Sequence, residues 1–348
     1  MKPISANEDS VTTEASLSRS TYAEISELAG VSKSTVSRVF NGDSRVHPDR
    51  VAAVFEAAQK IGYRPNRAAR ALSTGRTGLI AVVIDDNVSA LGDPFWGMVT
   101  SGVSRVLMQN SLQTLLMVAP LEDEDGPVAH YLESNEVDGV IFAQVHKETL
   151  VRKVAKSGVP VVVIGTPSDG AAGIHYVDTN NVAGGYMGTN HLFNIGCKTV
   201  ATITGDVGTS AGLHRLKGFE LAHKENNVKL NKNLIAYGNW SFDSAKILML
   251  RLLASNPDID GVFAANDISA MAAIAAIEER GKRVPDDIAV VGFDDTLVSQ
   301  TSRPALTTVK QDIVGLGEAA AEAMLEIIAG EKPDSRILST ELIIRQSA

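Results

Sequence analysis

The chain of 348 residues contains a single cysteine, Cys197, and no long apolar run. One cysteine excludes an internal disulfide framework and is compatible with a reducing compartment. No stretch approaches the roughly eighteen consecutive apolar residues of a membrane helix. The first twenty residues are rich in Ser, Thr and Glu and lack the apolar run of a signal peptide. We therefore expect a soluble, cytoplasmic protein without membrane contact, with residues 1–20 as a disordered tail.

Histidine is also scarce: the seven residues are scattered, and none is grouped with cysteine at metal-ligand spacing. The sequence predicts no metal site and no cofactor. Residues 208–212, Gly-Thr-Ser-Ala-Gly, do fit the Gly-x-Ser-x-Gly nucleophile elbow of hydrolases. In such enzymes an acid and then a histidine follow the serine. No histidine follows His223, and His214 is only four residues from Ser210. A hydrolase is therefore a weak alternative.

Charge is distributed unevenly along the chain. Residues 21–76 carry nine Lys and Arg against five Asp and Glu, whereas residues 77–348 carry 21 against 33. A small basic segment attached to an acidic body indicates that one end of the molecule meets a polyanion while the rest has another role.

The basic segment is predicted to form three short helices. Ile25, Leu28 and Ala29 give the first helix an apolar face, and Gly30 permits a tight turn. Ser32 is a favourable N-cap for a second helix, which Val36, Val39 and Phe40 hold against the first. A third helix begins at Pro48 and is expected to bury an apolar set consisting of Val51, Val54, Phe55, Ala58 and Ile61.

Two short helices joined by a glycine turn are typical of a helix-turn-helix, whose second helix enters the major groove of DNA. Lys33, Ser34 and Arg38 point away from the apolar stripe and are suited to base edges. The short polar side chains of Ser32, Thr35, Ser37 and Asn41 are suited to phosphate oxygens. An ordinary three-helix bundle with a solvated polar face is the alternative.

Residues 25–42 (ISELAGVSKSTVSRVFNG) and 62–72 (GYRPNRAARAL) resemble the start of a lactose/galactose-repressor (LacI/GalR) family protein. The resemblance implies a DNA-binding domain over residues 21–65 and a hinge helix and linker over residues 66–77. It also implies that Leu72 is wedged into the minor groove, a role that suits an apolar side chain. The expected DNA-binding residues are Thr21, Tyr22, Ser32, Lys33, Ser34, Thr35, Ser37, Arg38, Asn41, Arg45, Tyr63, Asn66, Arg67, Ala69, Arg70 and Leu72. The chain departs from the family at His47, where Ser or Thr is usual.

The remaining residues alternate between buried strands and amphipathic helices, which indicates parallel sheets with helices on both faces. Strands are predicted at 79–84, 114–118, 139–142, 159–164, 200–203, 261–265 and 288–291, with helices at 95–109, 184–193, 213–223 and 269–280. The resemblance implies a periplasmic-binding-protein-like α/β core of two doubly wound parallel-sheet lobes. Lobe one would comprise about 78–178 and 312–338, and lobe two about 179–311 and 339–348.

In open parallel sheets, ligands bind beyond the carboxyl ends of the strands. The loops at those ends hold carboxylates, amides, an arginine and an aromatic ring, which together suit a small polyol. By resemblance, the effector-binding residues are Asp93, Phe95, Asp178, Arg215, Trp240, Asn266 and Asp294. Each also has a purely structural interpretation. Asp178, Asn266 and Asp294 are candidate helix N-caps, Trp240 a candidate core residue and Arg215 a candidate surface ion pair.

These features together predict a transcription regulator, most often a repressor in this family, that binds a palindromic operator in double-stranded DNA. The chain has no heptad extension at residues 345–348, which favours a homodimer. The expected effector is a sugar-like small molecule, and a nucleoside or purine is the alternative within the family. A sugar-binding transport protein is the alternative outside it, since fold alone does not decide function.

Overall fold

The computed structural model describes residues 21–40, 45–63, 75–85, 92–119, 125–134, 136–143, 149–167 and 173–348. The chain divides into two compact units, Met1–Thr77 and Gly78–Ala348. The predicted hinge helix and Asn41 lie outside the described residues. Among the described helices, none is both long enough and apolar enough to cross a bilayer.

The first unit contains the three predicted helices: residues 21–28, α2 (Lys33–Phe40) and α3 (Pro48–Lys60). Gly30 adopts φ +62° in the turn before α2, a conformation that glycine reaches without strain. Ser32 caps α2, because its Oγ accepts a hydrogen bond of 3.1 Å from the Thr35 backbone N–H. The positive φ of Gly30 and the Ser32 cap therefore define the turn between the first two helices.

The core of this unit is built on Ile25, Val36 and Val54, all fully buried. Two residues that were predicted to lie in the core lie at the surface instead: Leu28 is 55% exposed and Phe55 is 52% exposed. The buried stripe of the first helix runs through Ile25 and Ala29, and Leu28 lies at its margin. Three short helices enclose little volume, so residues at the edge of each stripe remain in contact with water.

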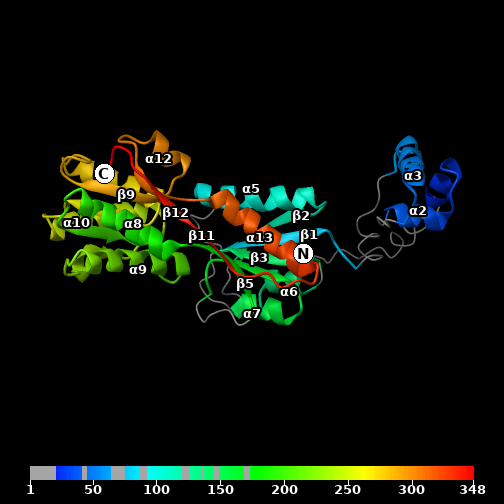
Figure 1. Ribbon diagram of the computed structural model, residues 1–348, viewed down its shortest axis with the longest axis horizontal. Helices are drawn as coiled ribbons and strands as arrows, with labels where there is room; N and C mark the ends of the chain where they lie inside the picture. The colour runs from blue at the N-terminus through cyan, green and yellow to red at the C-terminus, as the bar shows by residue number, and fades with distance from the viewer. Residues whose placement is uncertain are drawn as a thin grey trace, which may run out of the picture. The chain divides into compact units, whose positions relative to one another are not determined.

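Lobe one of the second unit is a six-stranded parallel sheet in the order β11-β5-β4-β3-β1-β2. Its strands are β1 (Leu79–Asp85), β2 (Gln113–Ala119), β3 (Gly139–Ala143), β4 (Val161–Ile164), β5 (His175–Thr179) and β11 (Arg336–Leu338). Helices α5 (Pro94–Gln109) and α13 (Ile313–Ile328) cover one face. Helices α6 (Pro127–Glu133) and α7 (Thr149–Lys156) cover the other (Figure 1).

Lobe two is a second six-stranded sheet, in the order β12-β10-β9-β8-β6-β7. Its strands are β6 (Val200–Ile203), β7 (Ile235–Ala236), β8 (Gly261–Ala264), β9 (Ala289–Asp294), β10 (Thr307–Gln311) and β12 (Thr340–Ile343), with a 3-10 turn over Lys232–Leu234. All neighbouring strands are parallel except β12, which runs antiparallel to β10 at the edge. The sheet is therefore parallel, as predicted, except at its β12 edge.

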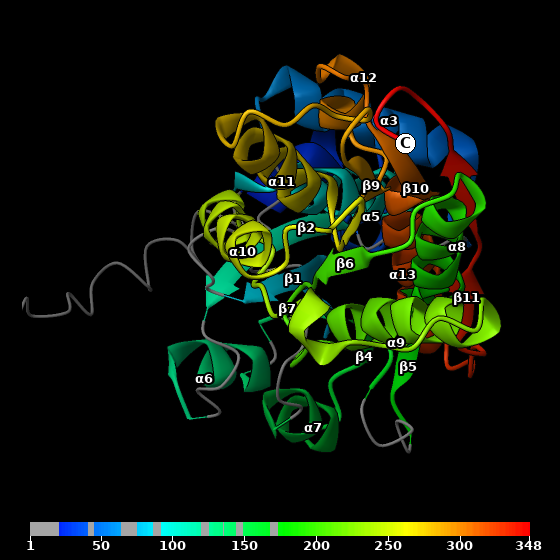
Figure 2. The same cartoon turned by 90° about the vertical axis from the view of Figure 1, so that its left-hand side faces the viewer.

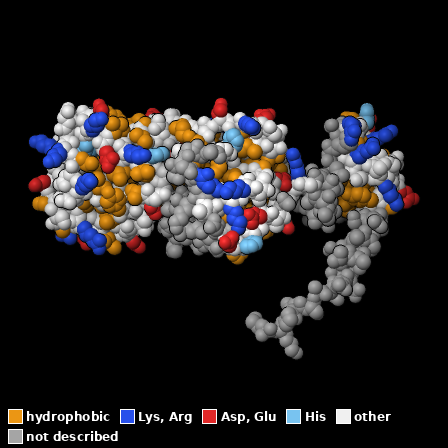
Figure 3. All heavy atoms as spheres, turned by 90° about the horizontal axis from the view of Figure 1, so that it is seen from below, with side chains coloured by type: hydrophobic (Ala, Val, Ile, Leu, Met, Phe, Trp, Pro, Cys, Tyr) orange, Lys and Arg blue, Asp and Glu red, His pale blue; other side chains and the backbone are white. Residues whose placement is uncertain are grey.

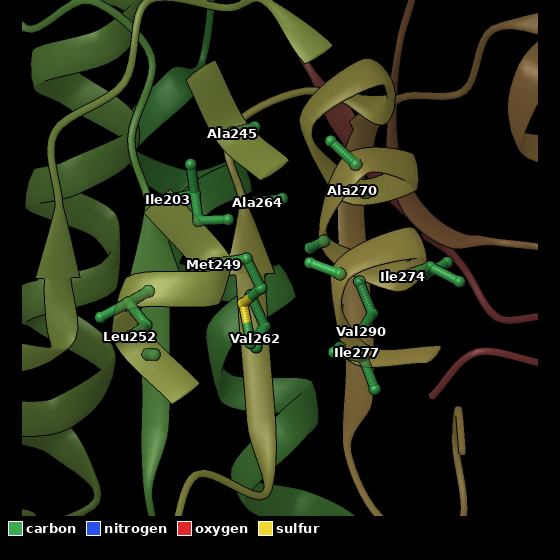
Figure 4. Close-up of a cluster of buried hydrophobic side chains, with 14 of the residues drawn as sticks. Ile203, Ala245, Met249, Leu252, Val262, Ala264, Ala270, Ile274, Ile277 and Val290 are labelled. Carbon is green, nitrogen blue, oxygen red and sulfur yellow. The ribbon is translucent and has the colours of Figure 1, made fainter. Parts of the chain in front are cut away.

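Helices cover both faces of this sheet as well (Figure 2). One face carries α8 (Asn181–Asn194) and α9 (Ser210–Glu225), and the other carries α10 (Phe242–Ser255) and α11 (Asp267–Glu279). A short α12 (Leu297–Thr301) follows β9. Figure 4 shows the packing of α10 and α11 on β6, β8 and β9, where Met249, Ile274 and Val262 are at most 1% exposed. Burial on both faces explains why these strands are continuous apolar runs.

The chain passes between the lobes three times, from β5 to α8, from β10 to α13 and from β11 to β12. These crossovers lie side by side. The Asn180 N–H donates to the Leu338 carbonyl over 2.8 Å, and Thr179 Oγ1 donates to Gln311 Oε1 over 2.7 Å. A change in the angle between the lobes must therefore involve crossovers that are hydrogen-bonded to one another.

Candidate functional site

A cavity of about 360 Å³ lies between the lobes, and all seven predicted effector-binding residues line it. Asp93 and Phe95 reach it from the start of α5 and Asp178 from the end of β5. The other four come from lobe two, at α9, the start of α10, the start of α11 and the end of β9. Segments separated by two hundred residues thus meet at one site, as the strand-end argument predicts.

Arg215 lies at the centre of the polar wall and is only 4% exposed. Its Nε donates to Asn181 Oδ1 over 2.8 Å, and its Nη1 donates to the Ala265 carbonyl at 2.5 Å. The guanidinium carbon lies 3.6 Å from the centre of the Phe293 ring. Burial lowers the pKa of Arg215, and Asp294 opposes that effect, so a guanidinium keeps its charge here.

Asp294 forms a buried ion pair with Arg215, with Nη1 and Oδ1 separated by 3.3 Å. The same Oδ1 accepts a hydrogen bond of 2.6 Å from Gln311 Nε2. Burial raises the pKa of Asp294 well above its ordinary value, while Arg215 acts in the opposite direction. Asp294 has φ +110°, which is strained for a residue with a side chain. Strain of this kind is often stored at functional sites.

Asp93 and Phe95 form the lobe-one wall of the cavity. Asp93 is the N-cap of α5, because its Oδ1 accepts a hydrogen bond of 2.9 Å from the Phe95 backbone N–H. Burial raises the pKa of Asp93, and the cap hydrogen bond opposes this effect. The Phe95 ring packs edge-on against Trp96, with 4.8 Å between ring centres. A second carboxyl group thus faces the cavity opposite Arg215 and Asp294.

Asp178 differs from these carboxylates because its oxygens are fully engaged by the protein. Oδ2 accepts from the N–H and the hydroxyl of Thr166, at 2.9 and 2.7 Å. Oδ1 accepts from the Thr179 N–H and from Asn181 Nδ2, at 2.7 and 3.0 Å. It is not the cap of α8, since that cap is Asn180. Asp178 therefore lines the cavity mainly as the support of Asn181, which in turn holds Arg215.

Trp240 and Asn266 form the remaining wall. Asn266 is the N-cap of α11 and donates from Nδ2 to the Trp240 carbonyl over 3.2 Å. Trp240 adopts φ +71°, and its ring lies against Gly205, where an added Cβ would approach the ring to 2.2 Å. Within the described part of the chain, the buried Trp240 Nε1 has no hydrogen-bond partner. The indole is therefore a flat wall with one free donor.

Three polar residues that were not among the predicted ones link the site together by hydrogen bonds: Thr179, Asn181 and Gln311. All three are buried and line the cavity. They complete a closed chain of hydrogen bonds that runs from Asp178 through Asn181, Arg215, Asp294, Gln311 and Thr179 back to Asp178. We call this set the buried ring. Amides at strand ends are the only sequence feature that marks Asn181 and Gln311, and such residues are common.

The Gly-x-Ser-x-Gly segment forms an ordinary helix start. Thr209 Oγ1 caps α9 by accepting from the Gly212 N–H at 3.2 Å and itself donates to the Asp206 carbonyl. Ser210 lacks the positive φ seen at Asp294 and Trp240. A nucleophile elbow places its serine on a sharp, strained turn, which is not the geometry here.

In the first unit, Lys33, Ser34 and Arg38 are exposed on α2, opposite its buried Val36, Val39 and Phe40. Figure 3 shows Lys and Arg side chains on the surface of this unit. The Ser32 hydroxyl lies 2.7 Å from Ser34 Oγ and 2.8 Å from Thr35 Oγ1. The short polar side chains at the start of α2 are thus held together by the cap.

Five other expected DNA-binding residues are described: Thr21, Tyr22, Ser37, Arg45 and Tyr63. Ser37 is partly buried on α2. Thr21 and Tyr22 lie in the first helix and Arg45 is exposed before α3. Tyr22 and Tyr63 pack on Phe40, with ring centres 5.7 and 5.3 Å away, so both also stabilise the core. Asn41, Asn66, Arg67, Ala69, Arg70 and Leu72 lie outside the described residues.

His47 takes over the helix-capping role of the usual Ser or Thr. It is the N-cap of α3, and its Nδ1 accepts a hydrogen bond of 3.4 Å from the Asp49 backbone N–H. A neutral imidazole accepts at one nitrogen and donates at the other. The fold of the unit therefore tolerates the substitution.

Comparison with known proteins gives matches over both units. Residues 21–66 match the family described as bacterial regulatory proteins, lacI family, and residues 189–348 match the periplasmic binding protein-like domain. The HTH-type transcriptional regulator CelR of Thermobifida fusca is 36% identical over 337 residues, which cover 94% of this chain and 98% of that protein.

Two solved structures extend the similarity to the fold. The transcriptional regulator CelR–cellobiose complex has a TM-score of 0.74 and 33% identity, and the match covers 94% of this chain and 99% of that one. The Lac repressor dimer bound to operator and the anti-inducer ONPF has a TM-score of 0.80 and 26% identity, covering 93% and 97%. The chain belongs to the lacI family of bacterial regulatory proteins and is a DNA-binding transcription regulator.

Proposed function

We propose that the inter-lobe cavity binds a neutral sugar and that its occupancy controls how a dimer of this chain represses transcription from a palindromic operator. The observation that carries the proposal is the buried pair of Arg215 and Asp294 on the cavity wall. Arg215 Nη2 and Asp294 Oδ2 make no hydrogen bond with the described part of the chain. Adjacent unpaired donor and acceptor groups suit vicinal hydroxyls, which donate and accept.

The charge of the cavity favours a neutral ligand over an anionic one. Asp93, Asp178 and Asp294 line it, and Arg215 is the one cation among its described lining residues. An anionic sugar derivative would have to be desolvated beside an excess of carboxylates. The Trp240 ring provides a flat surface for the apolar face of a pyranose.

Two of the similar structures support the proposal, one by its bound sugar and the other by its bound operator DNA. The CelR neighbour is a complex with cellobiose. The Lac repressor neighbour is a dimer on its operator. For this chain we propose that Lys33, Ser34 and Arg38 contact base edges, and that Ser32, Thr35, Ser37 and Arg45 contact phosphates. The minor-groove role of Leu72 stays a prediction. Such a regulator acts in the cytoplasm, and no enzymatic step is part of the proposal.

The buried ring offers a route from the ligand to the lobe angle. Arg215 is bonded to Asn181, at the start of α8 just after one crossover, and Asp294 is bonded to Gln311, next to another. A sugar that contacts Arg215 and Asp294 therefore affects the hydrogen bonds that these residues make to Asn181 and Gln311, beside the two crossovers. If the two lobe arrangements differ in affinity for the sugar and for DNA, binding shifts the population between them.

The test measures sugar binding and operator binding on the full chain. An operator is first selected from random DNA with the purified protein. Thermal unfolding is then followed with sugars, with adenosine and with hypoxanthine, since a ligand at 100 times its dissociation constant stabilises by about 2.7 kcal/mol. We expect stabilisation by at least one neutral sugar and a change in operator affinity, measured by fluorescence anisotropy, at the same concentration.

The matched variants are Asp294→Asn, at the cavity wall, and Asp258→Asn, at an exposed carboxylate. Asp294→Asn should remove the sugar response and retain operator binding, while Asp258→Asn should retain both. Stabilisation by a nucleoside or by hypoxanthine, with none by sugars, would reject the sugar assignment. A sugar response that survives in Asp294→Asn would reject the cavity assignment.

A further inference from the structure

The end of β9 contains two consecutive non-glycine residues in the left-handed region of backbone conformation. Asp294 has φ +110° and Asp295 has φ +54°. Glycine reaches such angles without strain, whereas a residue with a Cβ keeps them only when its surroundings hold it there. Thr296, the next residue, is buried. We call residues 294–296 the β9 turn.

This backbone conformation explains how two adjacent residues contact one guanidinium. Successive side chains of a strand point to opposite faces of a sheet. The Phe293 ring centre nevertheless lies 3.6 Å from the guanidinium carbon of Arg215, and Asp294 Oδ1 lies 3.3 Å from its Nη1. The positive φ of Asp294 breaks the regular alternation at this point. The position of the Asp294 carboxylate in the cavity therefore depends on the backbone of the β9 turn.

An arginine outside the cavity holds the second residue of the turn. Arg345 follows β12, and its Nη2 donates to Asp295 Oδ1 over 2.6 Å. Its Nη1 donates to the Leu306 carbonyl at 2.8 Å, and Ser299 Oγ donates to the same Asp295 oxygen at 2.8 Å. The Arg345 and Asp295 side chains are only 18% and 10% exposed, so solvent screens their ion pair little. Neither residue is among those that line the inter-lobe cavity.

A second contact holds the third residue of the turn. The N–H and the hydroxyl of Thr296 both donate to Asp267 Oδ2, at 2.8 and 3.0 Å. Asp267 Oδ1 in turn accepts from Thr308 Oγ1 over 2.6 Å. The β9 turn is thus held at two points directly after Asp294. The contact at Asp295 is the one that comes from a distant segment of the chain.

We infer that Arg345 and Asp295 are positioning residues of the effector site, because their ion pair keeps the β9 turn in the conformation that directs the Asp294 carboxylate toward Arg215. This inference rests on the proposed function, since it takes Asp294 as an effector contact. Without the ion pair, the turn relaxes toward ordinary backbone angles, and effector binding must restore the native conformation. A smaller fraction of binding-competent protein lowers the apparent affinity in proportion.

The first test compares two substitutions that remove the same carboxylate but differ in backbone freedom. Asp295→Ala and Asp295→Gly both leave Arg345 without this partner, yet only glycine takes φ +54° without strain. The probe is whichever of glucose, galactose, ribose and cellobiose stabilises the parent chain most, and calorimetry measures its affinity. We expect about tenfold weaker binding in Asp295→Ala and a recovery of at least about threefold in Asp295→Gly. Equal affinities would overturn the inference, because loss of the ion pair alone affects both variants alike.

The second test changes the arginine. Arg345→Met should weaken sugar binding by about tenfold, whereas Arg345→Lys, which keeps a cation for Asp295, should remain within about threefold of the parent chain. Arg251→Met, at an exposed position on α10, is the matched control and should retain the parent affinity. A merely structural role would lower the melting temperature of Arg345→Met and leave the sugar affinity of the folded protein unchanged. That result would overturn the inference.

A measurement without sugar separates this inference from the proposed function. In a crystal structure of Arg345→Met, or of Asp295→Ala if the first variant does not fold, we expect Asp294 to leave the positive-φ region and its contact with Arg215. Retention of both features would overturn the inference. If no sugar binds the parent chain while Asp294 moves in the variant, the proposed function is rejected and the positioning of Asp294 by Arg345 stands.

Discussion

Gln311 Nε2 donates to Asp294 Oδ1 over 2.6 Å, so a carboxylate on the cavity wall is held by the last residue before a crossover between the lobes. The other end of the Gln311 amide accepts from Thr179, at the neighbouring crossover. Both links are buried, where an unpaired polar group costs more than one exposed to water. A ligand that donates a hydrogen bond to Asp294 therefore affects the hydrogen bonds that join the two crossovers.

Replacing Gln311 by Leu should separate ligand binding from the ligand response. The variant leaves Asp294 paired with Arg215 but cuts the link to Thr179, so we expect about 1–3 kcal/mol loss of stability. Sugar binding should persist with moderately lower affinity, while the effect of the sugar on operator affinity should fall by at least about fivefold. Calorimetry and anisotropy on one preparation measure the two quantities. Lys310→Met, at the exposed neighbour on β10, is the control, and an undiminished sugar response in Gln311→Leu would refute the coupling.

Replacing Gly205 by Ala should displace Trp240. The added Cβ would approach the indole to 2.2 Å, so the ring must move toward the cavity. Overpacking of this kind costs about 1–3 kcal/mol, and we expect sugar affinity to fall by about tenfold or more. The quenching of Trp fluorescence by added sugar provides the readout. Gly97→Ala, in the exposed part of α5 with open space around its Cα, should instead raise stability slightly. The same fluorescence response in Gly205→Ala and the parent protein would contradict this placement of Trp240.

Asp267 makes the stability of lobe two depend on pH. Burial raises the pKa of Asp267 to about 6, although hydrogen bonds from Thr308 and Thr296 oppose the shift. Because the folded protein binds the proton more tightly than the unfolded chain, this contribution to stability is full below 3.8, the ordinary pKa of an aspartate, and is lost as pH rises through about 6. The destabilisation caused by Asp267→Asn should therefore be larger at low pH than at neutral pH, as urea unfolding would show. Asp258→Asn serves as the surface control, and a loss that is independent of pH would exclude this role.

Replacing Arg38 by Ala should change sequence preference as well as affinity. Arg38 is exposed on α2, on the face opposite its buried residues. A bidentate contact to a guanine contributes about 1–3 kcal/mol of discrimination, so selected sites should lose preference at one position per half-site. Lys60→Ala, at an exposed ion pair with Glu56 on α3, should lower affinity little and leave the preference intact. An unchanged selected sequence for Arg38→Ala would place this arginine on the backbone instead.

The helix-turn-helix and the seven residues that line the cavity could be predicted from the sequence. The buried residues that hold those seven in place, such as Thr179 and Gln311, could not. Strand ends rich in Asp, Asn and Phe follow apolar runs, and such runs are easy to recognise because both faces of these sheets are covered. Strands β5, β7, β10, β11 and β12 were not predicted. In β5 and β10, polar residues such as Asp178 and Gln311 interrupt the apolar character. Their polar residues are stabilised by partners far away in the chain, such as Thr179 by Gln311, and no local pattern encodes a contact across 132 positions.

The same limit explains the errors in the first unit. Leu28 and Phe55 are apolar residues at helical spacing, and the period alone assigns them to the core. Whether such a residue is covered depends on how much neighbouring chain is available. The resemblance to the family is confirmed by the comparisons, whereas the individual DNA contacts and the hinge remain predictions.

The buried ring has a consequence for changing the ligand specificity of this regulator. Arg215 and Asp294 cannot be exchanged for a new specificity without loosening Asn181 and Gln311, so such variants would lose the switch along with the old ligand. Ser241 and Phe242 line the inter-lobe cavity from outside the ring. A biosensor for a new ligand would therefore be made by changing these outer positions first. The buried ring would be kept unchanged, because it links the cavity to the crossovers between the lobes.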